Sequence, residues 1–464
     1  MNWQELVLER KDELLQELQQ LIQIESVLDE SNATEEYPFG PKPAEALAYL
    51  LQKGAEQGMK IKNVDNFAGH IEMGEGNELI GILGHVDVVP AGEGWSVPPF
   101  EGRIVDSKMI GRGTIDDKGP TIAAWMAMKL VKDAGISLER RVRLIIGTDE
   151  ESGFRCVRRY FETEEMPTLG FAPDADFPII NAEKGIAGIE LKQQASFESS
   201  KLLLFQSGER TNMVPDEASA LIQLPLDDVN ESFHEFLHTH KLSGKALDMD
   251  GKTSLLLYGK SAHAMEPDHG VNAAIKLAEF LTTLELDGQG NTFIATLVHA
   301  FASNSRGKDF DGYFADDMSG ETTYNAGIVQ FAKEEGFTIK VSMRYSVSCP
   351  FDEVMERITN HFKQRDVEVR VASNSAPHYV DKSDELIQSL SRVYERQTGH
   401  KAELVAIGGG TYARVLKKGV AFGMLFPGEP DVAHQADEFV NIDNLLKATA
   451  IYADAIAELA GKRE

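Results

Sequence analysis

The chain has 464 residues, of which 42% are hydrophobic and 26% are charged, and its formal net charge at pH 7 is −28. This length exceeds what one ordinary core accommodates, so we expect two domains. The strong negative charge argues against nucleic acid and anionic lipid surfaces as partners, and no stretch is long and apolar enough to span a membrane. Two widely separated cysteines and a charged first segment predict a protein of the reducing cytoplasm.

The first part of the chain alternates between helical and strand-like patterns. Residues 3–25 carry leucines at helical spacing and predict a packing helix, and residues 31–43 read as a polar loop. Residues 44–57 predict a second helix, and Gly58 is a plausible stop. Residues 67–84 then predict two neighbouring strands joined by a Gly-rich turn.

The second of these strands ends in His85 and Asp87, after the apolar run 80–84. Residues i and i+2 of an extended backbone point to the same face, so the imidazole and the carboxylate leave the strand together. This geometry suits a metal-ligating His whose neighbouring Asp holds the ring or lies beneath the metal. Taken alone, a surface His and Asp at a strand end is an equally good interpretation.

Further carboxylates follow in the same manner. A Gly-rich turn carries Asp116 and Asp117 to the start of a helix at 121–132, and two adjacent acids are more than one helix cap needs. The buried-strand pattern at 141–147 ends in Asp149, Glu150 and Glu151, and a later apolar run ends in Asp174 and Asp176. Ligands bind at the carboxyl ends of strands in open α/β sheets, so these clusters predict a dinuclear site of His and carboxylate ligands without thiolate.

The pattern changes after residue 185. Strand-like alternation at 186–192, 201–206, 217–224, 253–258 and 337–344, interleaved with helical segments, predicts an α+β insert with an at least partly antiparallel sheet. From about residue 377 the α/β character returns and ends in an amphipathic helix at 441–459. The glycines at 408–410 are not a phosphate-binding loop, because no Gly-Lys-Ser/Thr follows them.

Taken together, the motifs resemble those of the M20 metallopeptidases. The matching residues are His85-x-Asp87, Gly111-Arg112-Gly113-x-x-Asp116-Asp117-Lys118-Gly119 and Glu150-Glu151. The phrases at 171–178 and 181–185 resemble the carnosinase-like dipeptidase V branch of that family. The resemblance implies an α/β, zinc-peptidase-like catalytic domain with a mostly parallel sheet flanked by helices, at 1–185 and 377–464. It also implies an inserted α+β lid domain at 186–376, and a monomer, because the enlarged lid of this branch stands in for a dimer partner.

The resemblance also implies roles for single residues. Two divalent metal ions would share the bridging Asp116, with His85 and Asp174 on one ion and Glu151 and His434 on the other. The choice of Asp116 over Asp117, and of Asp174 over Asp176, rests on motif alignment alone, and family members have a cis peptide after the bridging Asp. Glu150 would be the general base that activates a water between the metals. Asp87 would orient His85, and His263 would stabilise the tetrahedral intermediate.

For the substrate, the resemblance implies an unblocked dipeptide. Its ends or backbone would be held by Asn212, Arg344 and the segment Gly409, Gly410 and Thr411. His and carboxylate ligands admit Zn²⁺, Mn²⁺ or Co²⁺. An N-acyl-amino-acid deacylase or a carboxypeptidase with the same site is the alternative enzyme. A catalytically silent metal- or peptide-binding protein is the non-enzymatic alternative.

Overall fold

The computed structural model describes residues 1–195 and 199–462 and divides into two compact units. Unit 1 comprises residues 1–181, 380–405 and 410–464, and unit 2 comprises residues 182–379 and 406–409. The short segment 406–409 thus groups with unit 2, although the sequence placed it in the second part of the catalytic domain. The predicted assignment of residue ranges to a catalytic and a lid domain stays a prediction.

Seven α-helices are described in unit 1. They are α1 (Trp3–Glu9), α2 (Lys11–Ile22), α3 (Pro41–Glu56), α4 (Lys118–Asp133), α5 (Arg155–Phe161), α10 (Glu385–Thr398) and α11 (Ile442–Ala460). The single helix predicted at 3–25 is wrong, because the backbone leaves the helical region at Arg10 (φ −108°, ψ 13°). The Arg10 guanidinium pairs with Glu13 and with Asp133 of α4, each at 2.9 Å, which fixes the break against the next layer.

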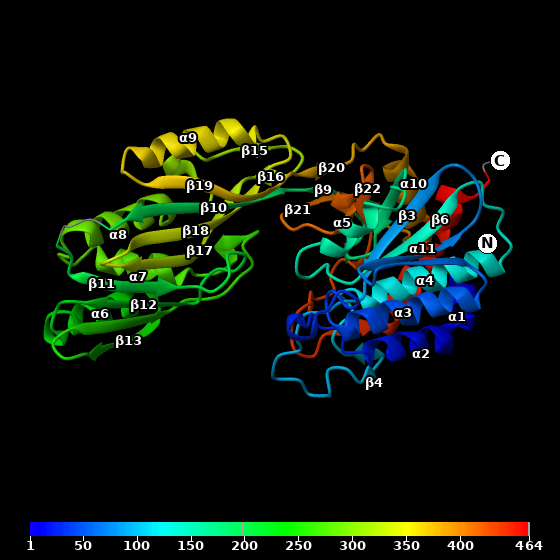
Figure 1. Cartoon of the computed structure of the whole chain (residues 1–464), viewed down its shortest axis with the longest axis horizontal. Coiled ribbons are helices and arrows are strands. Elements are labelled where there is room, and N and C mark those ends of the chain that lie inside the picture. The colour runs from blue at the N-terminus through cyan, green and yellow to red at the C-terminus, as the bar shows by residue number, and fades with distance from the viewer. Residues whose placement is uncertain (196–198, 463–464) are drawn as a thin grey trace. The chain divides into compact units, whose positions relative to one another are not determined.

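The sheet of unit 1 has parallel strands at its centre and antiparallel strands outside them (Figure 1). β6 (Arg141–Gly147), β3 (Leu79–His85), β7 (Leu169–Ala172) and β22 (Gly419–Ala421) are mutually parallel in this order. β1 (Lys60–Val64) and β2 (Ala68–Met73) extend the β6 side, and β9 (Ile179–Glu183) extends the β22 side, all antiparallel to their neighbours. The predicted α/β architecture is present, with its parallel pairing confined to the central strands.

Each residue of β3 is buried, as its uninterrupted apolar run predicts. His85 at its end lies opposite Gly147, the last residue of β6, and β7 runs parallel on the other side. Because parallel strands present their carboxyl ends at one edge, the segments after β3, β6 and β7 emerge together. This edge positions the acidic clusters noted in the sequence.

The helices of unit 1 share one apolar core with this sheet. α4 and α11 pack along each other and both contact the sheet, and α2 and α10 pack on these two helices. α4 is buried over nearly its whole length, including Trp125, whose indole N–H donates to Glu17 Oε2 of α2 at 2.8 Å. Smaller strands complete the unit: β4 (Arg103–Val105), β5 (Lys108–Ile110), β8 (Ala175–Asp176), β23 (Met424–Leu425) and β24 (Phe439–Asn441).

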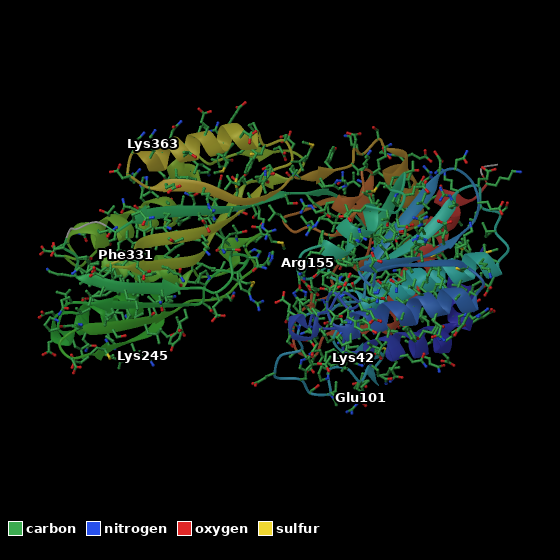
Figure 2. The ribbon with its side chains drawn as sticks, in the orientation of Figure 1. Lys42, Glu101, Arg155, Lys245, Phe331 and Lys363 are labelled. Atoms are coloured by element: carbon green, nitrogen blue, oxygen red, sulfur yellow. The ribbon has the colours of Figure 1, made fainter. Side chains whose placement is uncertain are left out.

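Unit 2 contains an antiparallel eight-stranded sheet. Its order is β13 (Ser243–Asp248), β14 (Thr253–Tyr258), β12 (Glu217–Ile222), β11 (Leu202–Ser207), β17 (Thr323–Ala332), β18 (Gly336–Tyr345), β10 (Gly185–Gln194) and β19 (Glu368–Ser375). Lys245 lies on the edge strand β13 and Phe331 on β17, near the centre (Figure 2). All its strand pairings are antiparallel, in agreement with the at least partly antiparallel sheet predicted for the insert.

The helices of unit 2 close a second apolar core against this sheet. They are α6 (Asn230–His240), α7 (Ala273–Leu281), α8 (Gly288–Phe301) and α9 (Phe351–Lys363). Short strands β15 (Ala315–Asp316) and β16 (Gly320–Glu321) pair with each other. The remaining short strands, β20 (His378–Tyr379) and β21 (Leu404–Ile407), both pair with β9. Within residues 1–195 and 199–462, no helix has both the length and the apolar content that a membrane crossing requires.

A buried polar network lies on β2, β6 and α5 of unit 1. His70 Nδ1 lies 2.7 Å from the hydroxyl of Tyr160, which accepts from Arg143 at 3.1 Å. Arg143 also donates twice to Glu72 Oε2, at 2.9 and 2.6 Å. Burial, together with the positive charge of Arg143, lowers the pKa of His70 to about 4.

We therefore expect His70 to reduce stability at mildly acidic pH. Below pH 6.5 the His70 side chain is protonated in the unfolded chain but stays neutral in the folded chain. The free energy of unfolding therefore decreases as the pH falls from 6.5 towards 4. Replacing His70 with Asn should remove up to about 2 kcal/mol of the loss in unfolding free energy between pH 7 and pH 5. Urea denaturation at both pH values measures this difference, and equal pH dependence of the two proteins would contradict the argument.

Candidate metal centre

The five predicted metal ligands lie in unit 1, on segments at the carboxyl edge of its sheet. His85 ends β3, Glu151 follows β6 and Asp174 follows β7. Asp116 lies in the turn before α4, and His434 lies in the loop before β24. Segments separated by more than 300 residues therefore meet at one place.

These side chains form two groups that share Asp116. In each group, one ligand atom per residue lies within 4.8 Å of the others: His85, Asp116 and Asp174 form one, and Asp116, Glu151 and His434 form the other. Asp116 Oδ1 lies 3.1 Å from His85 Nε2, while Asp116 Oδ2 lies 2.9 Å from His434 Nε2. One carboxylate thus presents one oxygen to each group, which is the arrangement a bridging ligand requires.

The orientation of the His85 ring leaves one nitrogen available to a ligand. Nδ1 lies 3.0 Å from the main-chain carbonyl of Asp87, which can only accept, so Nδ1 carries the hydrogen. Nε2 is then the lone-pair nitrogen. It is buried, has no hydrogen-bond partner among the described residues, and lies 3.7 Å from Asp174 Oδ2. A buried imidazole with an unused lone pair among carboxylates fits a divalent metal ion.

Asp87 supports the site in a way that the sequence did not predict. Its carboxylate lies 3.4 Å from His85 Nδ1, farther than its own carbonyl. The two carboxylate oxygens accept instead from the main-chain N–H groups of Glu150 and Glu151, each at 3.1 Å. Asp87 therefore fixes the turn that carries both glutamates, in addition to contacting the His85 ring.

The three adjacent acids after β6 have different surroundings. Asp149 is buried and belongs to neither metal group, and its carboxylate accepts from the guanidinium of Arg155 at 2.9 and 2.7 Å. Glu151 faces His434 at 3.1 Å. Glu150 belongs to neither group, but its carboxyl group interacts electrostatically with members of both. The structure thus separates one charge-paired residue, one candidate ligand and one candidate base.

The electrostatics of the cluster reflect carboxylates crowded together at a partly buried place. Burial, with the neighbouring charges of Asp174 and Glu151, raises the pKa of Glu150 well above its usual range. Burial also raises the pKa of Asp174, to which Asp117 and Asp116 contribute. Positive charge is therefore favoured here, and contacts with Asp116 and Glu151 raise the pKa of His434 to about 11. A divalent cation satisfies the same demand, so the donor set fits a metal ion.

Asp116 and Asp117 differ in role despite their adjacency, and the peptide bond between them is cis, as the resemblance implied. Asp117 Oδ2 accepts from the main-chain N–H of His85 and from the hydroxyl of Thr121, both at 2.9 Å. Asp117 is thus tied to β3 and α4. Asp176 lies on β8 and is exposed, outside both groups.

Sequence reasoning missed several supporting residues. Glu438 is fully buried and pairs with Arg112, and its other oxygen accepts from main-chain N–H groups of the turn that ends in Asp116. The ring of Tyr412 packs edge-on against His85, with ring centroids 6.0 Å apart. Arg112 stood inside a quoted motif, and Glu438 lies four residues after a predicted ligand. The positions of Arg112 and Glu438 in the sequence do not reveal that the two residues contact each other, because they are 326 residues apart.

The substrate residues predicted in the insert lie close together within unit 2. The segments of Asn212 and His263 pair through a bridge between Met213 and His263, and Ala264 N–H donates to the Asn212 carbonyl at 2.9 Å. Arg344 is buried and donates to the Gly408 carbonyl, next to Gly409, at 3.0 Å. Gly410 and Thr411 belong to unit 1, where Thr411 caps a short 3₁₀ turn at 412–415.

Comparison with solved structures identifies the class of fold. Human carnosine dipeptidase 1 matches with a TM-score of 0.58 and 14% identity, covering 98% of each chain. The dipeptidase Dug1p of Saccharomyces cerevisiae matches with a TM-score of 0.57 and 14% identity, again over 98% of each chain. At such low identity the likeness concerns the fold alone. It agrees with the expected architecture, an α/β catalytic domain with an α+β lid domain.

The sequence comparisons identify the family. The profile of Peptidase family M20/M25/M40 matches residues 81–458. "Putative dipeptidase YtjP" of Bacillus subtilis is 47% identical, covering 99% of this chain and 100% of that protein. "Putative dipeptidase SH1171" of Staphylococcus haemolyticus is 41% identical, over 98% and 99%. The chain belongs to peptidase family M20/M25/M40, which confirms the family predicted from its motifs.

The packing beneath His85 generates a prediction about Gly84. A Cβ at this position would lie 2.1 Å from Thr121 Oγ1 and 2.9 Å from Asp117 Oδ2. Gly84→Ala must therefore displace the two groups next to the His85 backbone, and we expect a loss of about 1–3 kcal/mol of stability. Gly153→Ala, where a Cβ would meet nothing within 4 Å, is the matched control. Thermal unfolding in the presence of a chelator compares them, and equal midpoints would refute the steric argument.

Proposed function

We propose that this chain is a dinuclear metal-dependent dipeptidase that hydrolyses dipeptides with free ends. The observation that carries the proposal is the carboxylate of Asp116, whose two oxygens face two different histidines at 3.1 and 2.9 Å. A structural ion-pair cluster does not need a carboxylate shared between two separate donor groups, whereas such a carboxylate suits a closely spaced pair of metal ions. The family membership and the relatives named as dipeptidases support the peptide substrate.

In this proposal His85, Asp116 and Asp174 hold one ion, and Asp116, Glu151 and His434 hold the other. When bound, the two ions would polarise the scissile carbonyl and lower the pKa of water at the site. Zn²⁺, Mn²⁺ and Co²⁺ all suit His and carboxylate ligands. The monomeric state and the cytoplasmic location stay predictions.

Glu150 is the proposed general base. Its carboxyl group lies beside both donor groups, and its turn is fixed by the two N–H contacts with Asp87. It takes a proton from the attacking water while the water oxygen bonds to the scissile carbonyl carbon. It then gives that proton to the leaving nitrogen as the C–N bond breaks. Burial and the nearby carboxylates raise the pKa of Glu150, which favours its holding the proton between the two transfers.

The predicted roles of the substrate-contacting residues complete the proposal. His263 would donate to the developing oxyanion, and Arg344 would hold the substrate carboxylate through its planar guanidinium. Asn212 and the segment 409–411 would contact the substrate backbone. Recognition of both free ends would limit the substrate to two residues.

We expect Glu150→Gln to lower kcat by about 10²- to 10⁴-fold, since the amide cannot accept a proton. Metal content, measured by atomic emission after gel filtration, should stay at the wild-type value because Glu150 is not a ligand. Glu9→Gln at the exposed end of α1 is the matched control and should retain full activity. Loss of metal from the Glu150 variant would show that it is a ligand and that the assigned roles are wrong.

A substrate panel tests the reaction itself. Release of free amino acids is measured from Ala-Ala, β-Ala-His, a tripeptide and N-acetyl-alanine, with Mn²⁺ or Zn²⁺ and with a chelator. We expect chelator-sensitive cleavage of the dipeptides only. Cleavage of N-acetyl-alanine alone would identify a deacylase, and cleavage of the tripeptide would favour a carboxypeptidase. Metal binding without any cleavage would favour the silent binding protein.

A further inference from the structure

Arg112 and Glu438 form a fully buried ion pair next to the proposed metal ligands. Arg112 Nη1 lies 2.5 Å from Glu438 Oε2, and the two residues are 1% and 0% exposed. Two charges withdrawn from water in this way carry a large desolvation cost, so such a pair is weak evidence for stability alone. Its contacts with the surrounding loops indicate another role.

Glu438 holds the turn that leads to Asp116. Its Oε1 accepts from the main-chain N–H groups of Gly113 and Ile115, each at 3.0 Å, and of Asp116 at 3.3 Å. One carboxylate oxygen thus gathers the last residues of the turn around itself. Any displacement of Glu438 moves the backbone from which the Asp116 side chain projects.

Arg112 joins this turn to the loop that follows β3. Its Nη2 donates to the carbonyls of Pro90 and Ala91, at 3.4 and 3.3 Å, and its guanidinium lies 5.2 Å from the ring centre of Trp95. That loop starts just after His85 and Asp87. The guanidinium therefore contacts the loop that follows His85, and it also pairs with Glu438, which holds the turn of Asp116.

Glu438 also restrains the segment of His434. The main chain at Glu438 continues directly into β24, and its carbonyl accepts from Gly111 N–H at 2.9 Å. The neighbouring Asp437 accepts from the main-chain N–H and the hydroxyl of Ser96, at 2.8 and 3.0 Å. The end of the His434 loop is thus attached at two adjacent residues.

We propose that Arg112 and Glu438 are positioning residues that hold Asp116 between His85 and His434. The pair connects the three loops that carry these ligands, so it sets the spacing of the two donor groups. The inference rests on the proposed function, because it assigns the pair to the metal ions that this function requires. Neither residue belongs to the two donor groups.

The test compares Glu438→Gln with Glu72→Gln. Glu72 forms a second buried ion pair in the same unit, with Arg143, towards the opposite end of β6 from His85. Both substitutions remove the carboxylate that is hydrogen-bonded to a buried arginine, so both should lower the unfolding midpoint. Only Glu438→Gln should weaken Zn²⁺ binding, by about 10- to 100-fold in competition with a chromophoric chelator, as loss of an outer contact to a ligand typically does.

Kinetics provide a second readout on the same proteins. At saturating metal we expect Glu438→Gln to lower kcat for Ala-Ala with little change in KM, because the residue does not contact substrate, and Glu72→Gln to leave both unchanged. Arg112→Lys keeps the positive charge but cannot reach both carbonyls and the carboxylate. It should weaken Zn²⁺ binding in the same direction, and it replaces Glu438→Gln if that variant does not fold.

The outcomes separate the two proposals. Wild-type protein that binds no Zn²⁺ would overturn the proposed function. Wild-type protein that binds two equivalents, with Glu438→Gln or Arg112→Lys binding them equally tightly, would overturn only the positioning role. Equal weakening in Glu438→Gln and Glu72→Gln would reduce the effect to general destabilisation and would also refute it.

Discussion

The proposed site depends on the cost of burying several carboxylates beside one another. Asp116, Glu150, Glu151 and Asp174 lie crowded and partly buried, which raises the pKa of three of them, whereas contacts with His434 and His85 lower the pKa of Asp116 despite its burial. Positive charge has to meet this demand, from the two histidines or from metal ions. The surrounding protein holds the carboxylates together, because the three segments that carry Asp116, the two glutamates and Asp174 meet at one edge of the sheet.

The way in which these segments are attached differs from one to the next. Asp117 ties the turn before α4 to the end of β3, and Asp87 ties the end of β3 to the turn after β6. Glu438 ties the last loop of the unit to the turn before α4. In each case a carboxylate that is not a candidate ligand accepts main-chain N–H groups of a segment that carries one. Acidic residues therefore build the frame of the site as well as its predicted ligands.

Much of this could be predicted from the sequence, for a physical reason. A continuous apolar run such as 80–84 can only be a buried strand or helix, and chemistry-bearing residues at its end have a direction fixed by the period of two. The break of the first helix at Arg10 was missed because the leucine spacing continues through it, while a contact with Asp133 of α4 decides it. Glu438 and Tyr412 were missed for a related reason, since their partners lie hundreds of residues away and leave no local pattern.

The path of the chain between the units has a consequence for protein engineering. Asn181 and Val380 flank the long excursion 182–379, and they are already joined by two hydrogen bonds of 2.9 Å, one in each direction. A short flexible linker between them would therefore close unit 1 without stretching its backbone. The excised excursion would still lack the four residues 406–409, which remain on the other polypeptide. Removing residues 182–379 would thus leave unit 1 on one continuous polypeptide, whereas the excised piece would be an incomplete unit 2.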